Sequence, residues 1–285
     1  MPIPRRVLFG LCALLGPSLA GGDWSATSMG YRYGTQFHEP GIQPAITKNT
    51  FTFTHANGYS LGENFFTVDL LRSDSNDPSN GAGSEGAQEV YAVYRHDLSL
   101  GKAFGTSLQA GPIRDVAFTA GFDYSAKNTA FAPAVRKILL GPTLAFAVPK
   151  GFVKLGLLYY TEKNHNSFGA GSDKNVSFDP TYQVALAWGL PVDLGPVATS
   201  FQGFGTYTGA KGKDGNLKDT QPETLVRMAW LFDVGAVAGK KGTWMLGPGY
   251  EYWKNKFGNA SPIPPPFGLP NPNTSCLTLN LEIRF

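Results

Sequence analysis

Beyond residue 22 the chain consists of segments of roughly 10 to 14 residues, a length typical of strands that cross a bilayer at a tilt, and in many of them apolar and polar side chains alternate. In one segment Met228 and Trp230 share one parity, whereas Arg227 and Asp233 share the other. A period of two places such sets on opposite faces of a sheet. No helical period is sustained after residue 22, so the pattern predicts an all-β chain.

The connections between these segments alternate between long and short. The short ones are expected at 56–58, 99–105, 149–151, 191–196 and 237–242, and the long, polar, Gly- and Pro-rich ones at 38–47, 73–86, 125–133, 165–176, 209–221 and 258–273. An antiparallel meander of this kind is typical of outer-membrane barrels, in which closure pairs every backbone group. We therefore predict a twelve-stranded antiparallel transmembrane β-barrel with short periplasmic turns and long extracellular loops. A soluble β-sandwich or lipocalin-like barrel is the alternative, because binary patterns on short strands are individually weak.

The last ten residues, CLTLNLEIRF, alternate without a break. Apolar side chains occupy the odd positions from Leu277 to Phe285, and polar side chains the even positions from Thr278 to Arg284. This segment resembles the terminal strand of outer-membrane proteins, which closes the barrel against the first strand and is recognised by the barrel assembly machinery. An ordinary edge strand is the alternative interpretation.

The first twenty residues have the layout of a secretory signal peptide. Arg5 and Arg6 precede an apolar stretch at 7–19, and small residues around Ala20 supply a cleavage site. The stretch is too short for a membrane-spanning helix. We therefore divide the chain into a signal peptide at 1–20 and a barrel at 21–285, and a buried amino-terminal helix is the alternative.

The charge, cysteine and histidine content of residues 21–285 limits the functions that the mature chain can have. Removing residues 1–20 takes away two of the 24 basic residues and leaves 22 against 21 acidic ones, a net charge of about +1. Such a balance argues against nucleic-acid binding and against a strongly ion-selective channel. Cys276 is the only remaining cysteine, so no internal disulfide can form. The four histidines are scattered and no metal-spaced cluster appears, so we expect neither a metal nor a cofactor.

Several segments resemble the nucleoside-specific channel-forming porins, the Tsx-like family. They are WSATSMGYRYGTQFHEPG (24–41), KNTFTFTHANGYSLGENFFTVDLLRSD (48–74), GAQEVYAVYRHDLSLGK (86–102), DVAFTAGFDYSAKNTAFAP (115–133) and TEKNHN (161–166). The resemblance implies a monomeric twelve-stranded barrel in the outer membrane of a Gram-negative bacterium. It also implies a narrow channel that passes nucleosides and deoxynucleosides, held by lumenal aromatic and ionisable side chains. The Pro-rich segment 261–273 departs from this family.

Strand parity selects the residues that face the lumen. A nucleoside site needs aromatic faces for the base and charged or amide groups for the sugar hydroxyls. The candidate substrate-binding residues are Arg32, Glu63, Phe65, Asp69, Glu89, Tyr91, Arg95, Tyr160, Arg227, Glu251 and Trp253. As an alternative, inward charges pair with one another and keep a narrow pore wet. Aromatic residues of the opposite parity are expected to contact lipid or form an interfacial girdle: Tyr31, Tyr33, Tyr94, Trp188, Trp230 and Tyr252.

One segment raises the question of catalysis. His165 and Ser167 share a face, as in outer-membrane lipid A deacylases, where such a pair with a nearby acid activates a serine nucleophile. Here no glutamate follows before Glu223, and no other catalytic motif appears. We therefore expect a passive, substrate-binding channel and no enzyme. A general small-solute porin is the nearest alternative, and an outer-membrane lipid hydrolase the second.

Overall fold

The computed structural model describes residues 23–81, 85–169, 174–260 and 273–285. The predicted signal peptide and most of the Pro-rich segment lie outside these residues. Twelve long strands form the molecule: β1 (Trp24–Phe37), β2 (Ile46–Tyr59), β3 (Gly62–Ser73), β4 (Gln88–Ser99), β5 (Ile113–Lys127), β6 (Arg136–Phe146), β7 (Phe152–His165), β9 (Thr181–Leu194), β10 (Val197–Thr208), β11 (Glu223–Asp233), β12 (Trp244–Lys254) and β13 (Thr274–Arg284).

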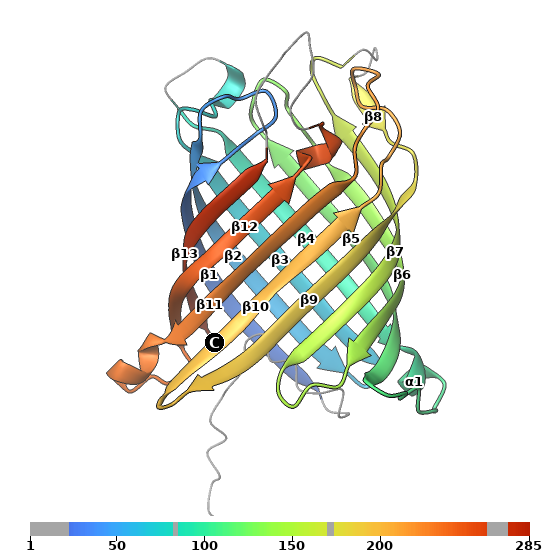
Figure 1. Ribbon diagram of the computed structural model, residues 1–285, viewed down its shortest axis with the longest axis vertical. Coiled ribbons are helices and arrows are strands. Elements are labelled where there is room, and N and C mark those ends of the chain that lie inside the picture. The colour runs from blue at the N-terminus through green and yellow to red at the C-terminus, as the bar shows by residue number, and fades with distance from the viewer. Residues whose placement is uncertain (1–22, 82–84, 170–173, 261–272) are drawn as a thin grey trace, which may run out of the picture.

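The twelve strands close into an antiparallel barrel (Figure 1). Each strand pairs with its neighbours in the chain, and β1 pairs with β13 to close the sheet. Between β7 and β9 the chain also forms β8 (Asn175–Ser177), a three-residue strand that pairs with the end of β7. The predicted all-β, twelve-stranded barrel is therefore confirmed. Among the described residues no helix is long and apolar enough to cross a membrane.

The two ends of the barrel differ. The start of β1, the end of β13 and the tighter connections lie at one end, called here the terminal end, and the longer loops lie at the other, the loop end (Figure 1). The turn between β6 and β7 needs its glycine, because Gly151 has φ +80° and a Cβ there would lie 1.9 Å from the Gly189 carbonyl oxygen. The loop end carries β8 and two 3₁₀ turns, η1 (Ser79–Gly81) and η3 (Lys256–Gly258).

The connection between β4 and β5 is longer than the predicted turn at 99–105. It spans residues 100–112 and begins with the short helix α1 (Leu100–Ala103). The Ser99 hydroxyl accepts a hydrogen bond from the Lys102 amide at 3.2 Å, which caps this helix and starts it directly after the strand. The turn between β11 and β12 likewise contains a 3₁₀ helix, η2 (Val234–Ala238), capped by Asp233.

Alternation along the strands gives the barrel a polar inside and an apolar outside. On β13 Thr278, Glu282 and Arg284 are buried in the lumen, while Leu277 and Phe285 are 77% and 71% exposed. Each strand adds exposed apolar or aromatic side chains to the outer surface, among them Met29, Phe51, Phe53, Leu70, Val90, Phe118, Phe122, Ile138, Leu157, Tyr159, Leu186 and Leu279. A belt of this kind matches the hydrocarbon layer of a membrane.

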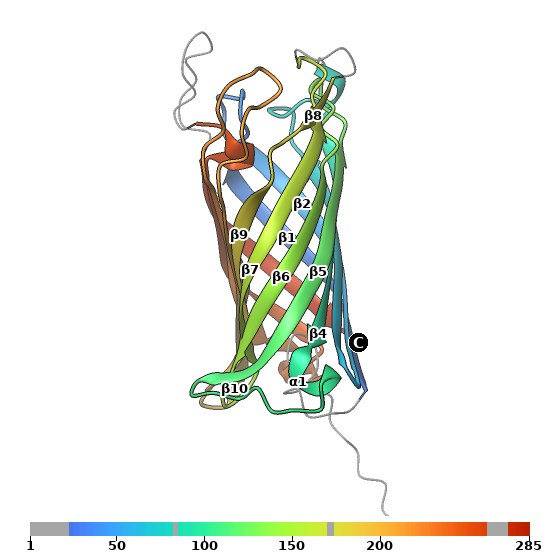
Figure 2. The same cartoon turned by 90° about the vertical axis from the view of Figure 1, so that its right-hand side faces the viewer.

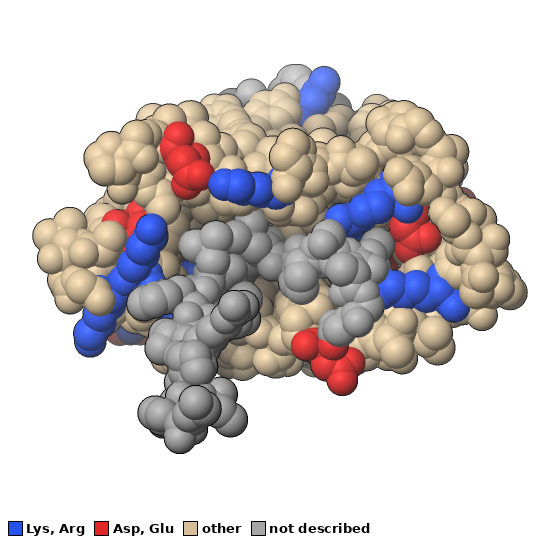
Figure 3. Space-filling view, turned by 90° about the horizontal axis from the view of Figure 1, so that it is seen from below, with Lys and Arg blue, Asp and Glu red and all other residues tan. Residues whose placement is uncertain are grey.

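The barrel is flattened. Figure 1 shows its broad side, Figure 2 shows a narrower one after a quarter turn, and the end view in Figure 3 has an elongated outline. A flattened section brings side chains of opposite walls within contact distance. Arg227 Nη1 of β11 and Asp69 Oδ2 of β3, for example, lie 3.1 Å apart, although four strands separate β3 from β11 in the sheet.

Candidate solute-binding site in the barrel lumen

The structure places all eleven candidate residues on the inner face of the barrel. Nine of them contact other lumenal charges, and Phe65 and Glu89 are placed by their register with Arg95 and Lys127. They do not form a single site. They distribute over four groups along the lumen, and lysines that were not among the candidates join three of these groups.

The central quartet consists of Arg32, Asp69, Arg227 and Glu251. Asp69 Oδ2 lies 3.1 Å from Nη2 of Arg32 on β1 and 3.1 Å from Nη1 of Arg227 on β11. Arg227 Nε lies 2.8 Å from Glu251 Oε2. Because four strands separate β3 from β11 around the sheet, the Asp69–Arg227 pair bridges the lumen. The quartet therefore narrows the pore.

A second group surrounds Asp123 on β5. The Tyr91 hydroxyl donates to Asp123 at 2.8 Å, and Arg95 Nη2 lies 2.7 Å from the other carboxylate oxygen. Lys137 Nζ donates to the Tyr91 hydroxyl at 3.1 Å and lies 5.6 Å and 5.8 Å from the ring centres of Tyr91 and Tyr160. This group combines two aromatic rings with donors and acceptors, the chemistry expected of a nucleoside site.

The third group lies toward the terminal end. Lys154 of β7 forms ion pairs with Glu63 of β3 and, at 2.8 Å, with Asp97 of β4. Thr119 donates to Asp97 at 2.6 Å. A small pocket opens beside this group, with Ser99, Asp115, Ala117, Thr143 and Ala145 completing its lining. Lys154 thus ties one side of the barrel to the other at this height.

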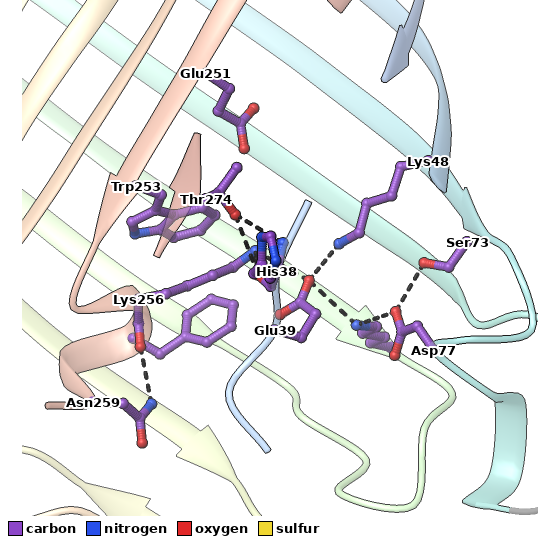
Figure 4. A network of polar contacts seen from close by, with 12 residues as sticks. His38, Glu39, Lys48, Ser73, Asp77, Glu251, Trp253, Lys256, Asn259 and Thr274 are labelled. Atoms are coloured by element: carbon purple, nitrogen blue, oxygen red, sulfur yellow. Dashed lines mark hydrogen bonds and ion pairs between the residues drawn. The ribbon is translucent and has the colours of Figure 1, made fainter. Parts of the chain in front are cut away.

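The fourth group, the mouth cluster, lies at the loop end and consists of Glu39, Lys48, Lys127 and Lys256. Figure 4 shows Glu39 at its centre, between Lys48 on one side and Lys256 on the other. Trp253 lies beside this cluster, with Lys256 Nζ 4.2 Å from its ring centre. Glu89 belongs to the same end of the lumen, since it is paired in register with Lys127.

The inward aromatic rings are less accessible than the sequence suggests. Tyr160 is 1% exposed, packs with Leu139 and Leu158, and donates from its hydroxyl to Glu162 at 2.5 Å. Lysine ammonium groups lie against Tyr91 and Trp253. A base that stacks on either ring therefore competes with a cation already placed there. Phe65, opposite Arg95 in the register, is the remaining inward aromatic of the candidate set.

Sequence reasoning did not select Glu39 or four of the lysines of these groups, Lys48, Lys127, Lys137 and Lys256. Lys48, Lys127 and Lys137 lie on strands, where the same parity rule that selected the candidates identifies them as inward. Glu39 and Lys256 lie beyond the strand ends, where parity carries no information. Only the three-dimensional path of the loops brings them into the lumen.

The six aromatic residues predicted to face outward share parity with exposed apolar residues on their strands. Tyr33 and Trp230 are among the exposed side chains. Trp188, Phe201, Trp230 and Phe232 form a continuous aromatic row, with ring centres 5.7, 6.1 and 6.4 Å apart along it. Such a row suits the interfacial zone of a membrane.

The His165–Ser167 pair lies where β7 runs into the loop end. Ser167 Oγ lies 3.4 Å from His165 Nε2, and His165 Nδ1 lies 3.3 Å from Asn175 Oδ1. Both distances are long for hydrogen bonds, and the third partner is an amide, which cannot stabilise an imidazolium as a carboxylate does. Among the described residues no group of three or more metal-ligating side chains occurs.

No protein-family model matches the sequence, and no curated protein matches it. The chain is similar to solved structures with which it shares little sequence identity. The translocator domain of the autotransporter NalP from Neisseria meningitidis is 14% identical, covers 93% of this chain and 88% of that chain, and has a TM-score of 0.42. A bacterial polysaccharide outer membrane secretin is 6% identical, with 92% and 98% covered and a TM-score of 0.40.

A variant of the monoaromatic hydrocarbon channel TodX is 10% identical, with 93% of this chain and 90% of that chain covered and a TM-score of 0.32. These matches include outer-membrane proteins of the barrel type. At such identities and TM-scores they support no conclusion about function. The barrel fold of this chain rests on its own strand pairing.

Proposed function

We propose that the chain is an outer-membrane channel that binds nucleosides and deoxynucleosides and lets them diffuse through its lumen. The observation that carries the channel proposal is the sorting of side chains in the closed barrel. Ionisable residues from most strands line the inside, and a belt of exposed apolar side chains surrounds the outside. The apolar outer face suits contact with lipid, and the polar inner face suits a water-filled passage.

The narrowness of the lumen favours a selective channel over a general porin. Barrels of sixteen to eighteen strands leave an open aqueous channel, whereas a barrel of about eight strands is filled by its side chains. This barrel has twelve long strands, and the Asp69–Arg227 and Lys154–Glu63 pairs bridge it. A solute has to displace or pass between these pairs, so contacts with the wall decide which solutes pass.

The nucleoside assignment rests on the resemblance to the Tsx-like porins and on the group around Asp123. Tyr91 offers a ring face for a base, and Asp123, Arg95 and Lys137 offer charged partners for sugar hydroxyls. These partners already bond one another. Binding therefore exchanges bonds within the wall for bonds to the solute.

Purified protein in planar bilayers tests this proposal against the general porin. We expect adenosine, thymidine and uridine to reduce the single-channel conductance in a saturable manner, and glucose at equal concentration to leave it unchanged. Equal reduction by nucleosides and glucose would favour a general small-solute porin. An absence of channels would contradict the transport role itself.

We further propose that the chain is not an enzyme, because His165 lacks a carboxylate partner among the described residues and its contacts with Ser167 and Asn175 are long. Lipid A in detergent micelles provides the test. Fatty-acid release by the wild-type protein that is lost in Ser167→Ala would establish the hydrolase instead.

The remaining proposals concern location and assembly. We propose that the mature protein is a monomer in contact with outer-membrane lipid and binds no nucleic acid, and that its last strand is recognised by the barrel assembly machinery. Supporting this, β13 forms the closing seam with β1, and the Phe285 amide donates to the Thr27 carbonyl at 2.9 Å. Fractionation of cells that express the chain tests the location.

A further inference from the structure

The mouth cluster joins parts of the barrel that are far apart in the sheet. Glu39 follows the end of β1, Lys48 lies on β2, Lys127 ends β5, and Lys256 follows β12. Glu39 Oε1 lies 3.0 Å from Lys256 Nζ and 3.5 Å from Lys127 Nζ, and it also forms an ion pair with Lys48. One carboxylate oxygen is thus shared by three ammonium groups from three sides of the opening.

These charges are removed from water. The side chains of Glu39, Lys48 and Lys256 are only 7%, 5% and 3% exposed. Burying an ammonium group is costly unless a negative partner compensates. Among the residues that the structure describes, Glu39 is the only carboxylate within ion-pair distance of Lys48 or Lys256, whereas Lys127 also pairs with Asp77 at 2.7 Å.

Three other acids lie near the mouth: Asp77, Glu251 and Glu89, the last of which faces Lys127 in register. Asp77 accepts a hydrogen bond from Ser73 at 2.8 Å in addition to its pair with Lys127, and Glu251 pairs with Arg227. Burial alone would raise the pKa of Glu39, but Lys127, Lys256 and Lys48 outweigh it and hold that pKa well below its usual range. Burial lowers the pKa of Lys256, and the nearby Glu39 acts against this change. The lysines and Glu39 therefore depend on one another.

Glu39 enters the lumen from the loop that follows β1. The backbone of His38 anchors that loop to the first residue of β13: its amide donates to the Thr274 hydroxyl at 3.1 Å, and its carbonyl accepts from the same hydroxyl at 3.2 Å. The lysines come from the wall and from η3, and the carboxylate is inserted between them (Figure 4). Geometrically, Glu39 is a tethered anion in a cationic pocket.

We propose that Lys48, Lys127 and Lys256 form an oxyanion-binding site at the mouth of the barrel, and that Glu39 occupies this site as an internal substitute for the ligand. The ligand class is a small solute with a carboxylate or phosphate group. Trp253 and Phe257, whose rings pack edge to face 5.1 Å apart beside Lys256, provide an apolar flank for the rest of such a solute. The site differs from the nucleoside-binding group, because nucleosides carry no charge.

Tethering determines how the site responds to free anions. A group held on a short linker competes at an effective concentration in the millimolar range or above. In the wild-type protein a free oxyanion must overcome this competition, so its apparent affinity is weak. In Glu39→Gln the amide keeps the shape of the side chain but removes its charge, and the vacated pocket is open to a free anion.

Isothermal titration of the purified full-length protein with inorganic phosphate, and separately with acetate, tests the proposal. We expect Glu39→Gln to bind at least one of the two at least tenfold more tightly than the wild-type protein. Binding of phosphate alone identifies phosphate-bearing solutes, binding of acetate alone identifies carboxylates, and binding of both identifies either. An affinity of Glu39→Gln no higher than that of the wild-type protein for both anions would overturn the proposal.

Two further variants control this comparison. Glu85→Gln makes the same change at an exposed loop-end pair with Arg72, where the side chains are 75% and 65% exposed, and should leave anion affinity unchanged. Adding Lys256→Gln to Glu39→Gln should abolish the gain. If Glu39→Gln does not assemble, Glu39→Asp retains the charge but retracts it by one methylene. A gain of at least threefold is then expected, and no gain would overturn the proposal.

Discussion

The central quartet and the mouth cluster both bridge the barrel with buried ion pairs, but they are built differently. In the quartet every charge lies on a strand, and its direction follows from the alternation of that strand. In the mouth cluster Glu39 and Lys256 lie in loops, and a single carboxylate serves three lysines. The quartet is therefore fixed to the strands, whereas in the mouth cluster Glu39 can move out of its ion pairs without breaking the pairing of the sheet.

Assembly of the barrel in the membrane should depend more on the pairing of β1 with β13 than on any single lumenal charge. Deleting Phe285 removes an exposed apolar side chain at the end of β13 and the amide that bonds to Thr27, and we expect most of the protein to be lost from the membrane fraction. Arg284→Ala removes only an inward charge on the same strand and should assemble near normally. Immunoblots of outer-membrane fractions measure both. Equal, normal yields would show that the terminal aromatic has no special role in assembly.

Removing a charge of the central quartet should also lower the free energy of unfolding substantially. Asp69→Ala leaves Arg32 without its ion-pair partner and Arg227 with one of its two. Removing one member of a buried ion pair costs about 3–5 kcal/mol, because the partner remains buried and unpaired. We expect a loss of this size in the free energy of unfolding, measured in urea with the protein in detergent micelles.

Asp193→Ala is the matched control for the quartet. Asp193 pairs with Lys150 at 3.1 Å, but the two side chains are 63% and 66% exposed. Exposed pairs contribute about 0–1 kcal/mol, so this variant should unfold almost as the wild-type protein does. Similar losses for Asp69→Ala and Asp193→Ala would mean that the quartet is solvated and does not bridge a narrow lumen.

The contrast also explains what could be predicted from the sequence. Alternation and connection lengths were sufficient for twelve strands and for the inward placement of residues such as Arg227 and Glu251, because period two has only two possible faces. Pairing across the lumen could not be predicted, since it depends on the flattened section of the barrel. Glu39 could not be assigned at all, because a loop residue has no parity and its partners lie nine to 217 positions away.

The nucleoside proposal predicts an effect of intermediate size, on the block of conductance by nucleosides. Tyr91→Ala removes a ring from the lumen, and the loss of one stacked base, about 1–3 kcal/mol, corresponds to roughly 5- to 150-fold weaker block of conductance by nucleosides. Tyr91→Phe keeps the ring and should retain most of the block, although its bond to Asp123 is lost. Val90→Ala alters the outer face and should not change the block.

The half-blocking nucleoside concentration in planar bilayers distinguishes these variants. A change in Val90→Ala without one in Tyr91→Ala would contradict the assignment of the faces of β4. If neither variant changes the block, Tyr91 only lines the lumen, and any nucleoside site lies elsewhere. If Tyr91→Phe loses as much as Tyr91→Ala, the hydroxyl and its bond to Asp123 matter rather than stacking.

The smallest expected effect is the pH dependence of the mouth cluster. The lysines hold the pKa of Glu39 well below its usual value of 4.5. A carboxyl group with a depressed pKa stabilises the fold above its unfolded pKa, and this contribution is lost progressively as the pH falls from the unfolded value through the lower, folded value. The difference in melting temperature between the wild-type protein and Glu39→Gln should therefore stay constant from about pH 7 to about pH 5. His38, Asp77, Glu89 and Glu251 also face this region, but they are present in both proteins, so their titration contributes equally to first order. Below about pH 4.5 the difference should shrink, because the unfolded chain then binds a proton that folded Glu39 does not. A difference that stays constant down to about pH 3 would show that Glu39 has the same pKa in the folded and unfolded states and that the three lysines do not hold it as the structure indicates.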